Sequence, residues 1–385
     1  MGARLIGIRV RTRESDPHGK GVLLLLLPYR GCCCCCVGGA MSASAAQKAA
    51  ALQLALEESS GDESLSPRNR KQTPRPSPTA ADKARALHQE MSDEDDDDED
   101  ERARARFLAA CAAVKAANGG APWGESGRLA RKVAIVTGGG KGIGAGIARA
   151  FAEQGACVVL ADLDFAAATA LAAEITASGA GGSGVPLRCD ARSDLPEAVR
   201  LAVEGLGQLD VLVNNAGWHP PNSTVEQTTQ ALMLEQCQLH IVGPFLGIQA
   251  AAKHLELSKG AVINVSSTSG IGGQELAAAY SASKAGLIGL TKSLAIDLGP
   301  RNIKVNCICP GGVMTPLMDQ ALLSYDDPAA ALAAGAATVK YLQPEGAGQF
   351  GQPSHLGAAA LFLATSDSSY VTGQVIVVDG GSSLG

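Results

Sequence analysis

The carboxyl-terminal two thirds of the chain are predicted to fold as an α/β domain, in which helices cover both faces of a doubly wound parallel sheet of about seven strands. Three observations support this prediction. From Arg131 onward, apolar runs of strand length alternate with stretches of helical pattern. The runs are almost continuously apolar, as expected of strands that are buried on both faces. The helical stretches supply the crossovers that parallel strands require.

The expected strands lie, in chain order, in the runs KVAIVT, ACVVLAD, VPLRCD, LDVLVNNAG, GAVINVSS, IKVNCICPGG and VIVVDGG. Together with the intervening helices they extend over roughly 250 residues, which is enough for one substantial core. We therefore expect a single domain at 129–385.

Residues 1–128 differ in composition and are expected to form a low-complexity, mostly disordered extension. They include the cysteine run Cys32–Cys36, a stretch rich in Ala, Ser and Pro, and the acidic run Asp93–Glu101. Such blocks bury too little apolar surface to offset the entropy lost on ordering. Their alanine and leucine content predicts short helices at 44–57 and 101–117. Whether the amino-terminal part is a targeting segment stays open.

The overall composition excludes some classes of function. Of 385 residues, 46% are hydrophobic and 18% are charged, and the net charge is −6. This gives no sign of the basic surface of a nucleic-acid-binding protein, and no apolar run is long enough to span a membrane. No cysteine pair has the spacing of a zinc site, so we expect neither a metal centre nor a disulfide framework, and a cytoplasmic location.

The first strand leads into the glycine-rich stretch VTGGGKGIGAGIARAF at 136–151. We expect a strand at Val133–Val136, a turn at Gly138–Gly144 and a helix at Ala145–Gln154. The amino-terminus of such a helix presents unpaired N–H groups and the positive end of its dipole to a pyrophosphate. The spacing is Gly-x-x-x-Gly-x-Gly, and a glycine turn without a ligand is the alternative.

The second strand ends at Asp162. A carboxylate at this position can accept hydrogen bonds from both hydroxyls of an adenosine ribose, and it would repel a 2′-phosphate. Asp162 therefore favours NAD over NADP. Lys141, in the glycine turn, is the one basic residue there that could attract the phosphate, and a solvated residue at the end of a strand is the alternative for Asp162.

Candidate catalytic residues follow the fifth expected strand. Tyr280 and Lys284 are four residues apart in a helical pattern, so both project from one face. A neighbouring ammonium and a positively charged nicotinamide ring would stabilise the tyrosine phenolate and lower its pKa from about 10. Ser267 lies at the carboxyl edge of the sheet, where doubly wound folds bind ligands, and can donate a hydrogen bond to a substrate oxygen.

These motifs occur in the order found in the short-chain dehydrogenase/reductase family, which 131–385 resembles throughout. The resemblance implies a Rossmann fold and direct hydride transfer between a nicotinamide and a carbinol or carbonyl carbon. It implies that Tyr280 is the general acid or base, that Lys284 holds the nicotinamide ribose, and that Ser267 positions the oxygen. The cofactor-binding residues that it implies are Thr137, Gly138, Gly142, Ile143, Gly144, Asp162, Asp190, Asn214, Ala216, Gly217, Tyr280, Lys284, Pro310, Gly311, Val313 and Thr315.

Some of these residues have specific implied roles. Asp190 resembles the residue that meets the adenine ring, and Asn214 the one that steadies the sheet beside the cofactor. Thr315 resembles a residue that contacts the carboxamide. His240 stands where the family usually has the asparagine of its catalytic tetrad. A histidine can also bind a water and relay a proton, but displacement of the water and compensation by local repacking are equally open.

Within the family, the segments NNAGWHPPN, GGQELAAAYSASK, NCICPGGVMTPL and GQPSHLGAAALFLA resemble hydroxysteroid dehydrogenases. This resemblance implies oxidation of a secondary alcohol, with steroids and small sugars such as L-fucose as candidate substrates, and a homotetramer. His219 and Gln274 match polar positions of the substrate pocket. The expected lid at 316–350 is rich in small residues and departs most from these relatives.

Two other functions remain possible at this point. A reductase of ketones bound to acyl carrier protein would share the catalytic residues, but it usually prefers NADPH, against which Asp162 argues. A dinucleotide-binding protein without catalytic activity would need a reason for keeping Ser267, Tyr280 and Lys284.

Overall fold

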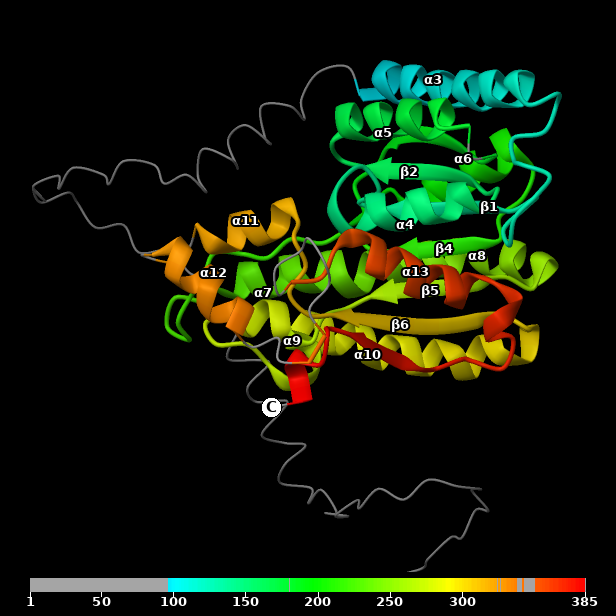
Figure 1. Cartoon of the computed structure of the whole chain (residues 1–385). Coiled ribbons are helices and arrows are strands. Elements are labelled where there is room, and N and C mark those ends of the chain that lie inside the picture. Colours follow the sequence, from blue (N-terminus) through cyan, green and yellow to red (C-terminus); the bar gives the residue numbers. More distant parts are fainter. Residues whose placement is uncertain are drawn as a thin grey trace, which may run out of the picture. The chain divides into compact units, whose positions relative to one another are not determined.

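The computed structural model describes residues 96–384 except 180, 324, 326, 338–340 and 343–349. In this part of the chain, seven parallel strands form one sheet in the order β3-β2-β1-β4-β5-β6-β7 (Figure 1). The predicted doubly wound parallel sheet is confirmed. The strands are β1 (Val133–Thr137), β2 (Cys157–Asp162), β3 (Ser183–Arg188), β4 (Val211–Asn214), β5 (Ala261–Val265), β6 (Lys304–Pro310) and β7 (Val375–Val378).

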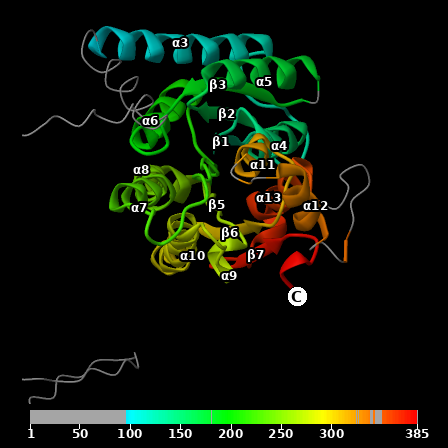
Figure 2. The same cartoon turned by 90° about the vertical axis from the view of Figure 1, so that its left-hand side faces the viewer.

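Helices cover the sheet on both faces, as Figure 2 shows. This explains why the central strands are continuously apolar: every residue of β1 and β5 is buried. The helices of one face are α6 (Leu195–Leu206), α8 (Gly243–Ser258) and α10 (Ala278–Leu298), and those of the other are α4 (Gly142–Glu153), α5 (Phe165–Ala177) and α13 (Pro353–Ala364).

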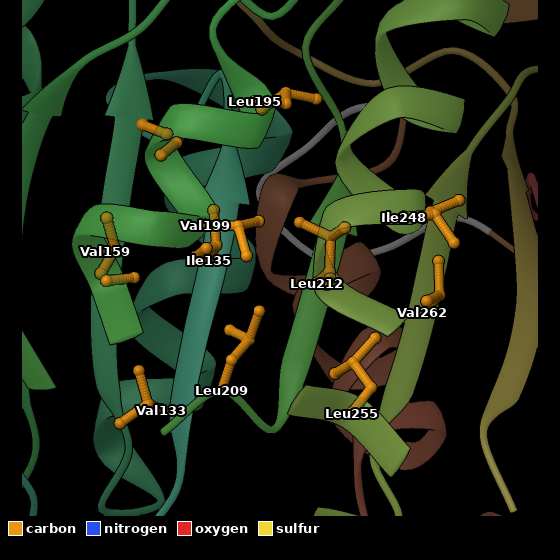
Figure 3. Close-up of a cluster of buried hydrophobic side chains, with 14 of the residues drawn as sticks. Val133, Ile135, Val159, Leu195, Val199, Leu209, Leu212, Ile248, Leu255 and Val262 are labelled. Atoms are coloured by element: carbon orange, nitrogen blue, oxygen red, sulfur yellow. The ribbon is translucent and has the colours of Figure 1, made fainter. Parts of the chain in front are cut away.

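Each face of the sheet has its own apolar core. Figure 3 shows the core on the α6 and α8 side, where Leu195 and Val199 of α6 and Ile248 of α8 lie over the strands. Burial of this kind stabilises a fold by about 25 cal/mol per Å² of apolar surface. The two cores hold the sheet rigidly, so the loops at its carboxyl edge start from fixed positions.

The strand order reverses between β1 and β4, which lie side by side although two strands, β2 and β3, separate them along the chain. Ligands bind at such a switch point in doubly wound sheets. The shorter elements around the sheet are α7 (Gln230–Cys237), η1 (Gln238–Val242), α9 (Ser269–Gly272), η2 (Gly299–Arg301), α11 (Pro316–Leu322), α12 (Pro328–Ala337), η3 (Ser366–Ser368) and η4 (Ser382–Leu384).

The strand arrows of Figure 1 point toward the side where α9, α11 and α12 lie. The helices α11 and α12 fall within the expected lid at 316–350, of which 324, 326, 338–340 and 343–349 lie outside the described residues. Among the helices of the described ranges, none has the length and apolar composition needed to cross a membrane.

One further helix, α3 (Asp96–Ala117), lies in the stretch that was expected to be a mostly disordered extension. The helix expected at 101–117 is therefore confirmed, but it is packed on the domain. Its Phe107 and Cys111 are 2% and 1% exposed and belong to the same core as α6. A Cβ on Gly205 of α6 would lie 2.7 Å from the Cys111 sulfur, so the two helices touch closely.

The folded part of the chain thus begins upstream of the expected boundary at residue 129, because α3 finds an apolar partner surface on α6 and β3. The other expectations for 1–128, including the helix at 44–57, fall largely outside the described residues.

Replacing Phe107 by alanine is expected to lower the free energy of unfolding by about 3–5 kcal/mol, as for other buried phenylalanines. The exposed Arg106 on the same helix is the control, and its replacement by alanine should change the free energy by less than about 0.5 kcal/mol. Urea denaturation measures both. Equal stability of the two variants would show that α3 does not contribute to the core.

Candidate active site

The turn between β1 and α4 brings backbone N–H groups to the carboxyl edge of the sheet. The helix α4 begins at Gly142 rather than at the expected Ala145, and no side chain caps its amino-terminus. A Cβ on Gly144 would lie 2.0 Å from the carbonyl oxygen of Gly138, so only glycine allows this close passage. Gly142 has a φ of +53°, which also favours glycine. The first turn of α4 therefore offers uncapped N–H groups to an anionic ligand.

The glycine turn is fixed from the side of β4. The hydroxyl oxygen of Thr137 accepts hydrogen bonds from the backbone N–H groups of Asn215 and Ala216, both at 2.9 Å. The Asn215 amide nitrogen in turn donates to the carbonyl oxygen of Thr137 at 2.8 Å. The Thr137 hydroxyl thus ties together the ends of β1 and β4, and the cofactor contact expected of this residue stays a prediction. Asn215 was missed, although it belongs to the motif NNAG.

Asp162 ends β2 beside the glycine turn. Its carboxylate accepts hydrogen bonds from the N–H groups of Gly140 at 2.8 Å and Asp164 at 2.9 Å. The ammonium of Lys141 forms an ion pair with Asp164 at 2.6 Å. The basic charge that could favour a 2′-phosphate is therefore paired with a carboxylate.

A cavity of about 1160 Å³ lies at the carboxyl edge of the sheet. Pockets for small molecules are typically about 300–1,000 Å³, so this one is large. Most of the expected site residues line it, namely Gly138, Gly142, Ile143, Asp162, Ala216, Gly217, His219, Ser267, Gln274, Tyr280, Lys284, Pro310, Gly311, Val313 and Thr315. The expected residues that do not line it are Thr137, Gly144, Asp190, Asn214 and His240.

The candidate catalytic side chains meet on one wall of this cavity. Tyr280 and Lys284 lie one turn apart on α10, and Ser267 follows β5. Tyr280 is 7% and Lys284 4% exposed. The Lys284 ammonium lies 5.7 Å from the centre of the Tyr280 ring and donates a hydrogen bond to the carbonyl oxygen of Val265 at 2.9 Å. The structure thus brings together the three residues that the sequence singled out.

Burial dominates the protonation of these groups. It raises the pKa of Tyr280 to about 12, against a smaller lowering by a hydrogen bond with Ser267. Burial also lowers the pKa of Lys284 to about 8, because removal of water disfavours an ammonium ion. The lowered tyrosine pKa expected from the sequence is therefore not produced by the side chains alone, which keep the phenol protonated at neutral pH.

A chain of hydrogen bonds connects His219 to Ser267. The His219 Nδ1 bonds the Pro220 carbonyl oxygen at 2.7 Å, so Nδ1 carries the proton and Nε2 accepts from the Gln274 amide nitrogen at 3.1 Å. The Gln274 oxygen accepts from the Ser269 hydroxyl at 2.8 Å. The Ser269 N–H donates to the Ser267 hydroxyl oxygen at 3.1 Å, and the Ser267 hydroxyl also bonds Tyr280 at the cavity wall.

Two of the expected cofactor residues have partners within the protein. The Asp190 carboxylate forms an ion pair with Arg192 at 2.6 Å, and its contact with an adenine ring stays a prediction. The Asn214 amide nitrogen donates to the side chain of Asn264 at 2.8 Å, which links β4 to β5. The role beside the cofactor that was expected of Asn214 stays a prediction.

His240 lies behind the cavity wall rather than on it. It belongs to η1, a π-helical turn between α7 and α8, and is 1% exposed. The edge of one ring meets the face of the other where His240 and Tyr280 pack, with ring centres 5.6 Å apart. Its Nδ1 bonds the hydroxyl of Ser283 at 2.8 Å, a partner that was not predicted from the sequence.

Comparison with known proteins gives a consistent result. Residues 138–383 match the family model described as enoyl-(acyl carrier protein) reductase. The chain is 41% identical over 260 residues to L-fucose dehydrogenase of Bos taurus. The aligned region covers 67% of this chain and 92% of that protein. It is 37% identical over 266 residues to trans-4-hydroxycyclohexanecarboxylate dehydrogenase of Sinomonas cyclohexanicum, and this alignment covers 68% of this chain and 96% of that protein. A solved short-chain type dehydrogenase/reductase from Mycobacterium marinum matches with a TM-score of 0.58 at 32% identity, over 67% of this chain and 97% of that one.

Proposed function

Since the chain belongs to the short-chain dehydrogenase/reductase family and is an oxidoreductase acting on CH–OH groups, we propose a finer activity. The proposed activity is that of an NAD-dependent dehydrogenase of secondary alcohols. The observation that carries the proposal is the meeting of Ser267, Tyr280 and Lys284 on the wall of one cavity that also reaches the glycine turn. A protein that only binds dinucleotides has no need of this arrangement.

The chain's own residues divide the chemistry between them. Ser267 donates its hydroxyl proton to the substrate oxygen, and Tyr280, in its phenolate form, removes the hydroxyl proton as general base. Lys284 stands beside the ring of Tyr280 and stabilises the phenolate. A bound nicotinamide supplies the acceptor for the hydride.

The residues present fit such a cofactor. The uncapped first turn of α4 suits a pyrophosphate, and the closeness of Gly144 to Gly138 leaves the backbone there uncovered by side chains. Asp162 is proposed to bind a ribose, and Thr315 to contact a carboxamide. Thr315 lies 3.3 Å from the position that a Cβ on Gly142 would occupy, so it borders the same turn.

NAD is the proposed cofactor, rather than NADP, because the Asp162 carboxylate repels a 2′-phosphate and Lys141 is paired with Asp164. Replacing Asp162 by asparagine removes this charge at nearly constant volume. The ratio of kcat/KM with NAD to kcat/KM with NADP is expected to fall at least about tenfold. Initial rates with both cofactors measure it, and an unchanged ratio would show that Asp162 does not select the cofactor.

The substrate is proposed to have an apolar body with one oxygen to be oxidised. The polar side chains of Ser267, Gln274 and His219 are gathered on one part of the cavity wall. The wall formed by the lid is mostly apolar, and its residues include Leu317, Met318, Leu322, Leu332 and Phe350.

A small sugar is the second candidate substrate. It is favoured by the 41% identity to an L-fucose dehydrogenase and by the hydrogen-bonded pair of His219 and Gln274. The resemblance of four segments to type 14 17β-hydroxysteroid dehydrogenase supports a steroid-like apolar alcohol instead.

A panel of secondary alcohols tests the proposal, with reduced cofactor followed by its absorbance. Cyclohexanol, a 17β-hydroxysteroid and L-fucose are offered with NAD and with NADP. The apolar alcohols are expected to give the higher kcat/KM, whereas turnover of L-fucose alone would assign the second candidate. Binding of cofactor without turnover of any alcohol or ketone would favour a dinucleotide-binding protein without catalytic activity. Faster reduction of ketones bound to acyl carrier protein, with NADPH, would favour a reductase of those ketones.

A homotetramer in the cytoplasm stays part of the proposal. The homotetramer is supported by exposed apolar side chains on α7, η1, α8 and α10, which include Leu234, Val242, Phe245 and Ile296. Exposed apolar side chains that lie together are typical of surfaces where subunits meet.

A further inference from the structure

His240 has one ring nitrogen that is bonded and one that is not. The ring is 1% exposed, yet its Nε2 has no hydrogen-bond partner among the residues that the structure describes. A buried polar atom without a partner is costly, and an ordered water usually satisfies it. The bare nitrogen therefore requires an explanation.

The partners of Ser283 determine which nitrogen of His240 carries the proton. The Ser283 hydroxyl donates to the backbone carbonyl oxygen of Tyr280 at 2.8 Å. Since a hydroxyl has a single proton, its oxygen must accept from His240 Nδ1, 2.8 Å away. Burial and the nearby charge of Lys284 lower the pKa of His240 well below its usual value, so the ring is neutral. Its Nε2 thus presents a lone pair.

His240 Nε2 and the Lys284 ammonium border the same small space. A Cβ built on Gly217 would be 2.8 Å from His240 Nε2 and 3.3 Å from Lys284 Nζ, so both nitrogens border the space next to Gly217. No direct hydrogen bond joins them, because Nε2 has no partner within the described part of the chain. A separation of this kind suits one bridging water.

We propose that His240 is a positioning residue whose Nε2 accepts, through one bound water, a hydrogen bond from the Lys284 ammonium, and that Ser283 holds the tautomer required for this. The water donates one proton to Nε2 and accepts one from Nζ, which satisfies both buried groups. Lys284 is thereby kept charged and directed toward Tyr280. The inference rests on the proposed function, because the reaction is what gives the position of Lys284 its importance.

The first test is spectroscopic and uses the protein without cofactor or substrate. The ¹⁵N chemical shifts of the His240 ring, assigned by comparison with a His240→Leu variant, are expected to show a proton on Nδ1 and none on Nε2. In a Ser283→Ala variant this pattern should be lost. A proton on Nε2 in the parent protein would overturn the inference, whatever the enzyme's activity.

The second test is kinetic and has a matched control on the same helix. Ser283→Ala and His240→Leu are each expected to lower kcat about tenfold while KM for substrate and cofactor changes less than about threefold. Ser281→Ala makes the same chemical change two residues away, and Ser281 Oγ has no hydrogen-bond partner in the described ranges, so this variant should match the parent.

Thermal unfolding of each variant separates a loss of kcat from a loss of folded protein. A Ser283→Ala variant with the parent's kcat would overturn the inference, and so would a His240→Asn variant more than about tenfold faster than the parent. If the parent turns over no alcohol, the proposed function fails, and the ring spectrum still decides the tautomer and its dependence on Ser283.

Discussion

Replacing Tyr280 by phenylalanine is expected to lower kcat about a thousandfold, because general acid–base catalysis by a positioned side chain contributes roughly 10²–10⁴. The variant removes a single oxygen from a side chain that is 7% exposed, so the ring still fills its place against His219 and His240. Binding of NAD, measured by fluorescence titration, should change less than about threefold. The loss therefore falls on the chemical step.

The control for this prediction is Tyr370, whose side chain is fully exposed. Tyr370→Phe makes the same chemical change far from the cavity and should leave kcat unaltered. A Tyr280→Phe variant as active as the parent would exclude the mechanism proposed for Tyr280. A variant that no longer binds NAD would instead show that Tyr280 acts mainly in cofactor binding.

Replacing Gly144 by alanine is expected to abolish cofactor binding and to lower the free energy of unfolding by about 3 kcal/mol or more. The added Cβ would lie 2.0 Å from the Gly138 carbonyl oxygen and 2.7 Å from the Asn215 amide nitrogen. A backbone atom has no free rotation by which to give way, so the turn must open. Thermal unfolding and NAD titration measure the two effects.

Gly289 offers a matched control within α10. A Cβ there meets nothing within 4 Å, so Gly289→Ala should be neutral or should stabilise the helix by roughly 0.5–1 kcal/mol. A Gly144→Ala variant with unchanged unfolding and unchanged NAD affinity would show that the turn is looser than its geometry indicates.

The parts of the fold that were predicted correctly depend on local pattern. Continuous apolar runs identified the strands, and the spacing of Tyr280 and Lys284 identified one face of α10. The start of α4 was predicted three residues late, because glycine has a poor intrinsic tendency to form helix and the early start at Gly142 depends on tertiary contacts.

The contacts that the sequence did not reveal join distant residues. His219 reaches Gln274 across 55 positions, and His240 reaches Ser283 across 43. No periodic pattern records such pairs. The packing of α3 was missed for a related reason: the helix offers few large apolar residues, and the surface of α6 that they cover lies about a hundred residues later.

The position of α3 also bears on how the protein behaves in concentrated solution. The helix packs against β3, the outermost strand of the sheet next to β2. An outermost strand presents unpaired N–H and C=O groups on which a strand of another molecule can assemble. Proteins avoid aggregation by covering such strands or by interrupting them, and β3 shows both devices, since it also contains Pro186. A chain that begins at residue 129 would keep every catalytic side chain, but without α3 it would lose the larger part of this protection.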